Sequence, residues 1–161
     1  MGGTLAGWRH RAMLAAMLGW VAPALAQTAP VELALQGRVE HPRTLALDEL
    51  RALPPVTVEA AAHGEGKASY TGALLWTVLA AAMPVDDAGK GRRFQHVVVA
   101  RGQDGYAVAL AIGELDPRLE NKQVVIAYEE DGKPLPALHL AVPGDAHAAR
   151  GVRDLVAIEV R

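Results

Sequence analysis

The apolar residues of this chain come in short runs, and glycine or proline interrupts almost every one of them. Runs of about five residues are too short for long helices and match the length of strands. Residues 96–100 and 106–110 are separated by turn-forming residues and predict a hairpin. Because strands outnumber helices, we expect an α+β domain with a mixed β-sheet and short helices. About seven strands are expected, at residues 31–37, 56–59, 96–100, 106–110, 124–128, 138–142 and 156–160.

The helical segments are predicted from spacing and from the residues that end them. Asp48 stands where a helix cap belongs, and Pro54 ends that helix. Pro84 ends a second segment that has apolar residues at helical spacing. Gly72, just before that segment, is expected to permit close packing. Helices are predicted at residues 48–53, 74–82 and 112–115, a helical turn at residues 152–155, and loops at residues 60–69 and 86–93.

The N-terminus has the parts of a secretory signal. Two arginines precede an apolar run at residues 12–21, and small residues follow it. A run of about ten residues is too short for a membrane span, which needs about 20. We therefore expect residues 1–26 to be a signal peptide cleaved near the Ala26-Gln27 bond. Residues 27–161 are expected to form a single domain in the periplasm or outside the cell.

The chain contains no cysteine, and this removes several classes of function. A thiol nucleophile, a thiolate metal ligand, an iron–sulfur cluster and a covalently attached c-type haem all require one. The formal net charge is −2 and no basic run occurs, which argues against a nucleic-acid partner or an anionic membrane surface. No second apolar run is long enough to span a membrane. The partner that we expect is a small anionic ligand or a periplasmic protein.

Five segments carry a family resemblance when they are read in order. They are "GRVEHPRTLALDELRALP", "YTGALLWTVLAAA", "RRFQHVVVARGQDGYAVALAIGELD", "VVIAYEEDGKPLP" and "HLAVPGDAHAARGVRDLVAIEV". The ordered set, over residues 37–160, resembles the molybdopterin-binding oxidoreductase domain family. The resemblance implies the sulfite-oxidase-like fold. For catalytic members it also implies a molybdopterin cofactor whose molybdenum is held by one cysteine.

The sequence departs from that family at the metal ligand. The resemblance places the cysteine near residues 60–63, where this chain has three alanines and His63. Alanine offers no ligand, and imidazole is a harder donor than thiolate. His139 stands near an arginine that relatives often carry, and the long insertions of catalytic members are missing. We therefore expect a non-catalytic binding or accessory module, with no catalytic residues and no molybdopterin. The alternative is a molybdopterin-dependent oxidoreductase that holds its cofactor without cysteine.

Histidines supply the first candidate site residues. Through the resemblance, His63 and His139 are expected to contact a ligand in a surviving pocket. Together with His96 or His147 they could also form a metal site, because neutral imidazoles bind zinc and copper. The spacing of His139 and His147 matches no known metal motif, so no metal ligand is assigned. The competing interpretation is an exposed loop position for His63 and hydrogen-bonded strand positions for His96 and His139.

Arg150 and Arg153 complete the predicted site. They follow a glycine-containing loop, near where the family resemblance places contacts to an anionic cofactor. Guanidinium groups bind oxyanions through charge-assisted hydrogen bonds, so both arginines are expected to hold an anion. The competing interpretation is that they lie at the surface in ion pairs with Asp145 or Asp154.

Overall fold

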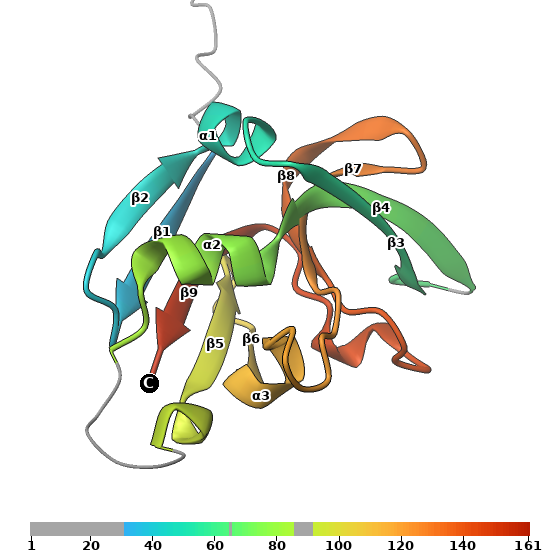
Figure 1. Ribbon diagram of the computed structural model, residues 1–161. Coiled ribbons are helices and arrows are strands. Elements are labelled where there is room, and N and C mark those ends of the chain that lie inside the picture. Colours follow the sequence, from blue (N-terminus) through green and yellow to red (C-terminus); the bar gives the residue numbers. More distant parts are fainter. Residues whose placement is uncertain (1–30, 65, 86–91) are drawn as a thin grey trace, which may run out of the picture.

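The computed structural model describes residues 31–64, 66–85 and 92–161 (Figure 1). The predicted signal peptide, residues 1–26, lies outside the described residues. Within the described part of the chain, no helix combines the length and the apolar character that a membrane crossing requires.

Two sheets form the framework of the domain. The five-stranded sheet has the order β2-β1-β9-β5-β6, and β1 pairs with β9 in parallel while the other neighbours are antiparallel. This confirms the prediction of a mixed sheet. Its strands are β1 (Glu32–Gly37), β2 (Arg43–Ala46), β5 (Val97–Gly102), β6 (Ala107–Ala111) and β9 (Leu155–Val160).

The second sheet carries the site. It has the order β3-β4-β7-β8, with every neighbouring pair antiparallel. Its outer end, away from the helices in Figure 1, contains the turn between β3 and β4. The strands are β3 (Pro55–Ala61), β4 (Lys67–Leu74), β7 (Val125–Glu130) and β8 (Lys133–Ala141).

The short helices cover the apolar faces of the sheets. In α2 (Leu75–Ala82) the predicted apolar stripe is buried, and the helix ends at Met83 in a left-handed conformation before Pro84. In α1 (Leu47–Arg51) and α3 (Ile112–Leu115) a glutamate side chain accepts a hydrogen bond from the backbone N–H three residues earlier. Single turns of 3₁₀ helix lie at η1 (Arg92–Gln95) and η2 (Ala148–Arg150).

The main core joins both sheets and α2. It contains buried side chains from β1 and β9, such as Leu35 and Ile158, together with Leu79 of α2 and Ile126 of β7. A smaller apolar cluster packs Tyr70 of β4 with Val125, Ala127 and Ala141 of β7 and β8. Apolar burial of this kind is the main favourable term in folding. The candidate site packs against this smaller cluster through Tyr70.

Several predicted elements were wrong in detail. β2 and most of β4 were not predicted, and β4 occupies the end of the predicted loop at residues 60–69. Residues 152–155 are not helical, because the backbone of Val152 exchanges two hydrogen bonds with Leu140 and Leu155 begins β9. The predicted loop at residues 86–93 lies outside the described residues, except for its last two, which begin η1.

Candidate functional site

The site begins at the turn between β3 and β4, where His63 lies exposed. The turn is closed by backbone hydrogen bonds from Ala62 N–H to Gly66 C=O (3.1 Å) and from Gly64 N–H to Ala62 C=O (2.9 Å). A β-bridge between Ala60 and Pro143 ties the end of β3 to the segment after β8. His63 is therefore held against residues that are far away in sequence.

His139 of β8 lies beneath His63 and is only 7% exposed. Its ring centroid is 5.1 Å from that of His63 and 5.0 Å from that of Tyr70, and both ring pairs are tilted. The His139 ring nitrogens form no hydrogen bond with any described residue, and neither is sealed from solvent. A buried polar group normally has a partner. The ring nitrogens of His139 are thus available to hydrogen-bond with a molecule in the adjacent cavity.

Gly151 lets both imidazoles lie close to its backbone. A Cβ atom at this glycine would lie 3.1 Å from Nε2 of His63 and 3.5 Å from Nε2 of His139. Both Nε2 atoms therefore lie near the backbone of Gly151. A Cβ atom at this position would crowd Nε2 of His63 and the carbonyl oxygen of Ala148 and make an ordinary contact with His139.

Tyr70 and Glu130 support His139 from below. The Tyr70 hydroxyl donates a hydrogen bond of 2.9 Å to Oε1 of Glu130. Burial raises the pKa of Tyr70 to about 12, and the hydrogen bond and charge of Glu130 act in the same direction. The phenol is therefore neutral at physiological pH, with its one proton committed to Glu130.

The two imidazoles are also held neutral. Burial lowers the pKa of His139 to about 4, and the positive charges of His63 and Arg153 add to this effect. Burial also lowers the pKa of His63, with Arg153 adding to the shift and Glu130 opposing it. Near neutral pH both rings can offer one N–H donor and one nitrogen lone pair.

Three adjoining hollows surround this cluster, and all of them are lined by His63 and Arg153. The hollow over His139 has a volume of about 260 Å³ and includes Tyr70, Glu130 and an apolar wall from β8. A second, of about 350 Å³, lies over Gly151. The third, of about 750 Å³, contains Lys67 and His147, and no acidic side chain occurs among the described residues that line it.

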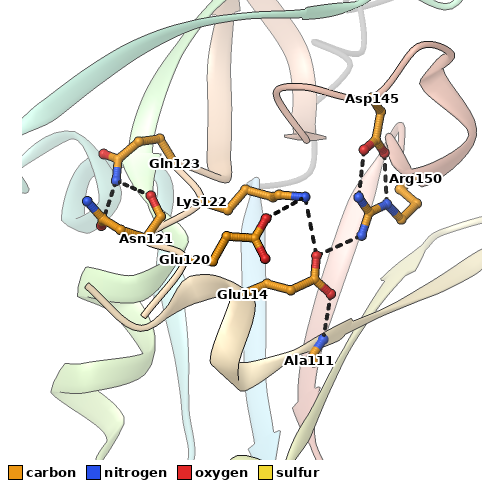
Figure 2. A network of polar contacts seen from close by, with 8 residues as sticks. All are labelled: Ala111, Glu114, Glu120, Asn121, Lys122, Gln123, Asp145 and Arg150. Carbon is orange, nitrogen blue, oxygen red and sulfur yellow. Dashed lines mark hydrogen bonds and ion pairs between the residues drawn. The ribbon is translucent and has the colours of Figure 1, made fainter. Parts of the chain in front are cut away.

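The two predicted arginines have different environments. Arg153 is exposed at the rim of all three hollows, and its guanidinium forms no hydrogen bond or ion pair with any described residue. Arg150 lines none of them. Figure 2 shows Arg150 between Asp145 and Glu114, with contacts of 2.6 to 3.0 Å. The structure thus places His63, His139 and Arg153 together and turns Arg150 away.

The Arg150 network fastens the segment after β8 to α3. The hydrogen bonds from Arg150 lower the pKa of Asp145. At Glu114 burial would raise the pKa, but the hydrogen bonds of the network together lower it by more. Lys122 adds a contact of 3.3 Å to Glu114. Because Arg150 donates to two carboxylates, its own pKa is raised. This network holds η2 and Gly151 in place beneath the site.

Replacement of Arg150 by methionine is expected to lower the free energy of unfolding by about 2 kcal/mol, because two partly buried carboxylates lose their partner. Urea denaturation at pH 7 measures the change. Arg161→Met is the control, since it removes an exposed pair with Glu159 and should shift the midpoint far less. Equal shifts in the two variants would show that the Arg150 network has no special structural role.

The comparisons with known proteins agree with the fold. The family model described as "Oxidoreductase molybdopterin binding domain" matches residues 20–161. The chain belongs to this family. A solved structure, the sulfane dehydrogenase SoxCD from Paracoccus pantotrophus, superposes with a TM-score of 0.62 at 19% identity. The match covers 81% of this chain but 38% of the SoxCD chain, and at this identity it shows the shared fold. No curated protein matches the sequence.

The molybdopterin-binding domain of this chain does not fit molybdenum ligation by a protein thiolate. The cluster offers imidazole, phenol, carboxylate and guanidinium groups, and the chain contains no sulfur from cysteine. Ala60, at the start of the segment where the resemblance places the ligand, is buried, and its backbone is engaged in the bridge to Pro143. Molybdenum prefers a soft thiolate, which none of these groups supplies.

The other histidines that the sequence suggested are placed differently. His96 is buried with Nε2 2.8 Å from the carbonyl of Val85 and Nδ1 3.2 Å from the carbonyl of Arg161. His147 is exposed and lines only the largest hollow. Among the described residues, no group of three or more histidine, aspartate or glutamate side chains is arranged to hold a metal.

Sequence analysis did not select Tyr70, Glu130 and Gly151. Tyr70 is the aromatic residue two positions before Gly72, and alternation along β4 directs it inward. With residues 60–69 interpreted as a loop, that alternation was not visible. Glu130 is the last residue of β7, and Gly151 has no side chain to suggest a role. Their roles follow from contacts between strands that are distant in sequence.

Proposed function

We propose that this protein is an exported, non-catalytic binding module of the molybdopterin-binding domain family, and that it takes a small anionic ligand. The observation that carries the proposal is His139, a buried and neutral imidazole that forms no hydrogen bond with any described residue and lines a cavity beside Arg153. A ligand in this cavity would complete the hydrogen bonding of His139 and neutralise the guanidinium.

The charge around the largest hollow supports an anion. This hollow brings together Lys67, Arg153 and two histidines, without an acidic side chain among its described lining residues. The smallest hollow is also lined by Glu130 and Asp154, and Glu130 already accepts the hydrogen bond of Tyr70. Arginine binds oxyanions through paired N–H groups, and neutral imidazoles add further donors.

The protonation of the buried groups favours binding over catalysis. A general acid or base works best with a pKa near the operating pH. The pKa of His139 is about 4 and that of Tyr70 about 12, so neither group exchanges its proton readily near pH 7. Neutral groups with fixed protonation are suited to recognising a ligand.

The alternative function is a molybdopterin-dependent oxidoreductase that binds its cofactor without cysteine, since the family as a whole binds molybdopterin. Metal and pterin analysis of the protein, purified from the periplasm of a molybdenum-replete host, distinguishes the two. We expect neither molybdenum nor pterin at stoichiometric levels. Stoichiometric amounts of both would overturn the proposal of a non-catalytic module. The N-terminal sequence of the same preparation tests export and cleavage near Ala26-Gln27.

Replacement of Arg153 by glutamine is expected to weaken binding of inorganic phosphate at least about tenfold, because a charge-assisted hydrogen bond is lost. Phosphate titration followed by amide NMR shifts measures the affinity and shows whether His63, His139 and Gly151 respond. Arg92→Gln removes an exposed arginine of η1 that lines none of the three hollows and is the matched control. If the two variants bind phosphate equally well, the anion site is not at Arg153.

A further inference from the structure

Two imidazoles lie next to Gly151 without bonding to each other. Both Nε2 atoms lie within 3.5 Å of the position that a Cβ atom would occupy there, yet no hydrogen bond joins the two rings. Nor does His139 use its nitrogens elsewhere among the described residues. Imidazole is the commonest metal ligand in proteins, and these two rings line one hollow.

We propose that His63 and His139 form a two-imidazole site for a borderline-soft divalent metal ion, with the remaining coordination positions open to solvent or to an exogenous ligand. The proposal goes beyond anion binding, since it needs both histidines but not Arg153. Imidazole suits zinc and copper in particular, and the Irving–Williams order predicts that copper(II) binds more tightly than zinc(II).

The separation of the rings agrees with this geometry. A metal–nitrogen bond of about 2 Å places a ring centroid about 3 Å from the metal. Two rings bound at angles between a right angle and the tetrahedral angle then have centroids about 4.4 to 5 Å apart. The observed separation of His63 and His139 is 5.1 Å. The exposed position of His63 leaves its ring free to adjust to a metal ion.

The charges around the two rings act on a cation in opposite senses. Arg153 lines the hollow that His63 and His139 share, and its guanidinium repels a metal ion. Glu130 and Asp154 line the same hollow and attract one.

Calorimetric titration of the full chain with copper(II) and with zinc(II) tests the proposal. We expect one site per chain, with copper(II) the tighter ligand, and electron paramagnetic resonance showing two equatorial nitrogens in the copper complex. His63→Ala and His139→Gln should each weaken copper(II) binding at least about tenfold. His41→Ala, which removes an exposed histidine between β1 and β2, should leave the affinity unchanged.

Gly151→Ala retains both histidines and tests the space beside them. The backbone of Gly151 has φ −70, which alanine adopts without strain, but the new methyl group would lie 3.1 Å from Nε2 of His63 and displace that ring. We expect weaker copper(II) binding in a folded protein. Arg153→Gln should weaken phosphate binding and tighten copper(II) binding, so the two proposals fail separately. If His63→Ala leaves the copper(II) affinity and the nitrogen couplings unchanged, the copper is an adventitious ion only. That result would overturn the proposed metal site.

Discussion

Replacement of Gly72 by alanine is expected to lower the free energy of unfolding by about 4 kcal/mol or to prevent folding altogether. A Cβ atom at Gly72 would lie 2.0 Å from the carbonyl oxygen of Ile126 and 2.6 Å from Cα of Ala127. Both contacts are with the backbone of β7, which cannot rotate away as a side chain can. The methyl group can be accommodated only if β4 and β7 separate, and this would break their hydrogen bonds.

The position explains why the effect should be large. The pairing of β4 with β7 shifts register between Thr71 and Gly72, so the two backbones approach closely at this irregularity. Gly72 also lies between Tyr70 of the site and the start of α2. Displacing Gly72 would disturb both the smaller apolar cluster beside the site and the main core.

Urea and thermal denaturation measure the change, with Gly113→Ala as the matched control. A Cβ atom at Gly113 would meet only Leu119, at an ordinary contact distance of 3.5 Å, and the position is in α3, where alanine is the better helix former. We expect Gly113→Ala to be neutral or slightly stabilising. If the free energy of unfolding of Gly72→Ala is within about 1 kcal/mol of that of the wild type, the backbone of β7 can move to accommodate the methyl group.

The regular parts of this fold could be predicted from local sequence pattern. The apolar stripe of α2 and the hairpin of β5 and β6 follow from periodicity and turn residues, and both were found. β4 was missed because small and polar residues begin it, and its place in the sheet comes from pairing with β3 and β7. Such pairing depends on tertiary context, which overrides the weak strand preference of Lys67 and Ser69.

The candidate site was predicted only in part, for a related reason. His63, His139 and Arg153 come from three segments that the sequence separates widely, and family resemblance rather than local pattern suggested that they meet. Arg150 has the same side chain as Arg153 and lies three residues away, but Asp145 and Glu114 are positioned to bind it. Which arginine is left unpaired is decided by the orientation of η2 and the segment after β8. That orientation cannot be inferred from the sequence alone.

The stability of this protein is expected to fall as the pH is lowered from about 6.5 to about 4, because of His139. Its pKa is about 4 in the folded state against the ordinary 6.5, so within this range the unfolded chain binds a proton that the folded chain does not. The unfolded state is then favoured increasingly as protons are added. The full contribution is about 3 kcal/mol, and it is present above pH 6.5 and lost as the pH approaches 4.

The difference between wild type and His139→Leu isolates the contribution of His139 and its coupling to His63, since groups distant from the site titrate equally in both proteins. Urea denaturation of each from pH 7.5 to pH 4 should show a shallower loss of stability in the variant, whatever its stability at pH 7. NMR titration of the His139 ring in the wild type provides the direct measurement, and no protonation is expected above about pH 5. Parallel profiles, with His139 protonating near its ordinary pKa, would mean that the cavity admits enough water to solvate the imidazolium. In that case the neutral imidazole on which the anion-binding proposal depends would exist only above that pKa.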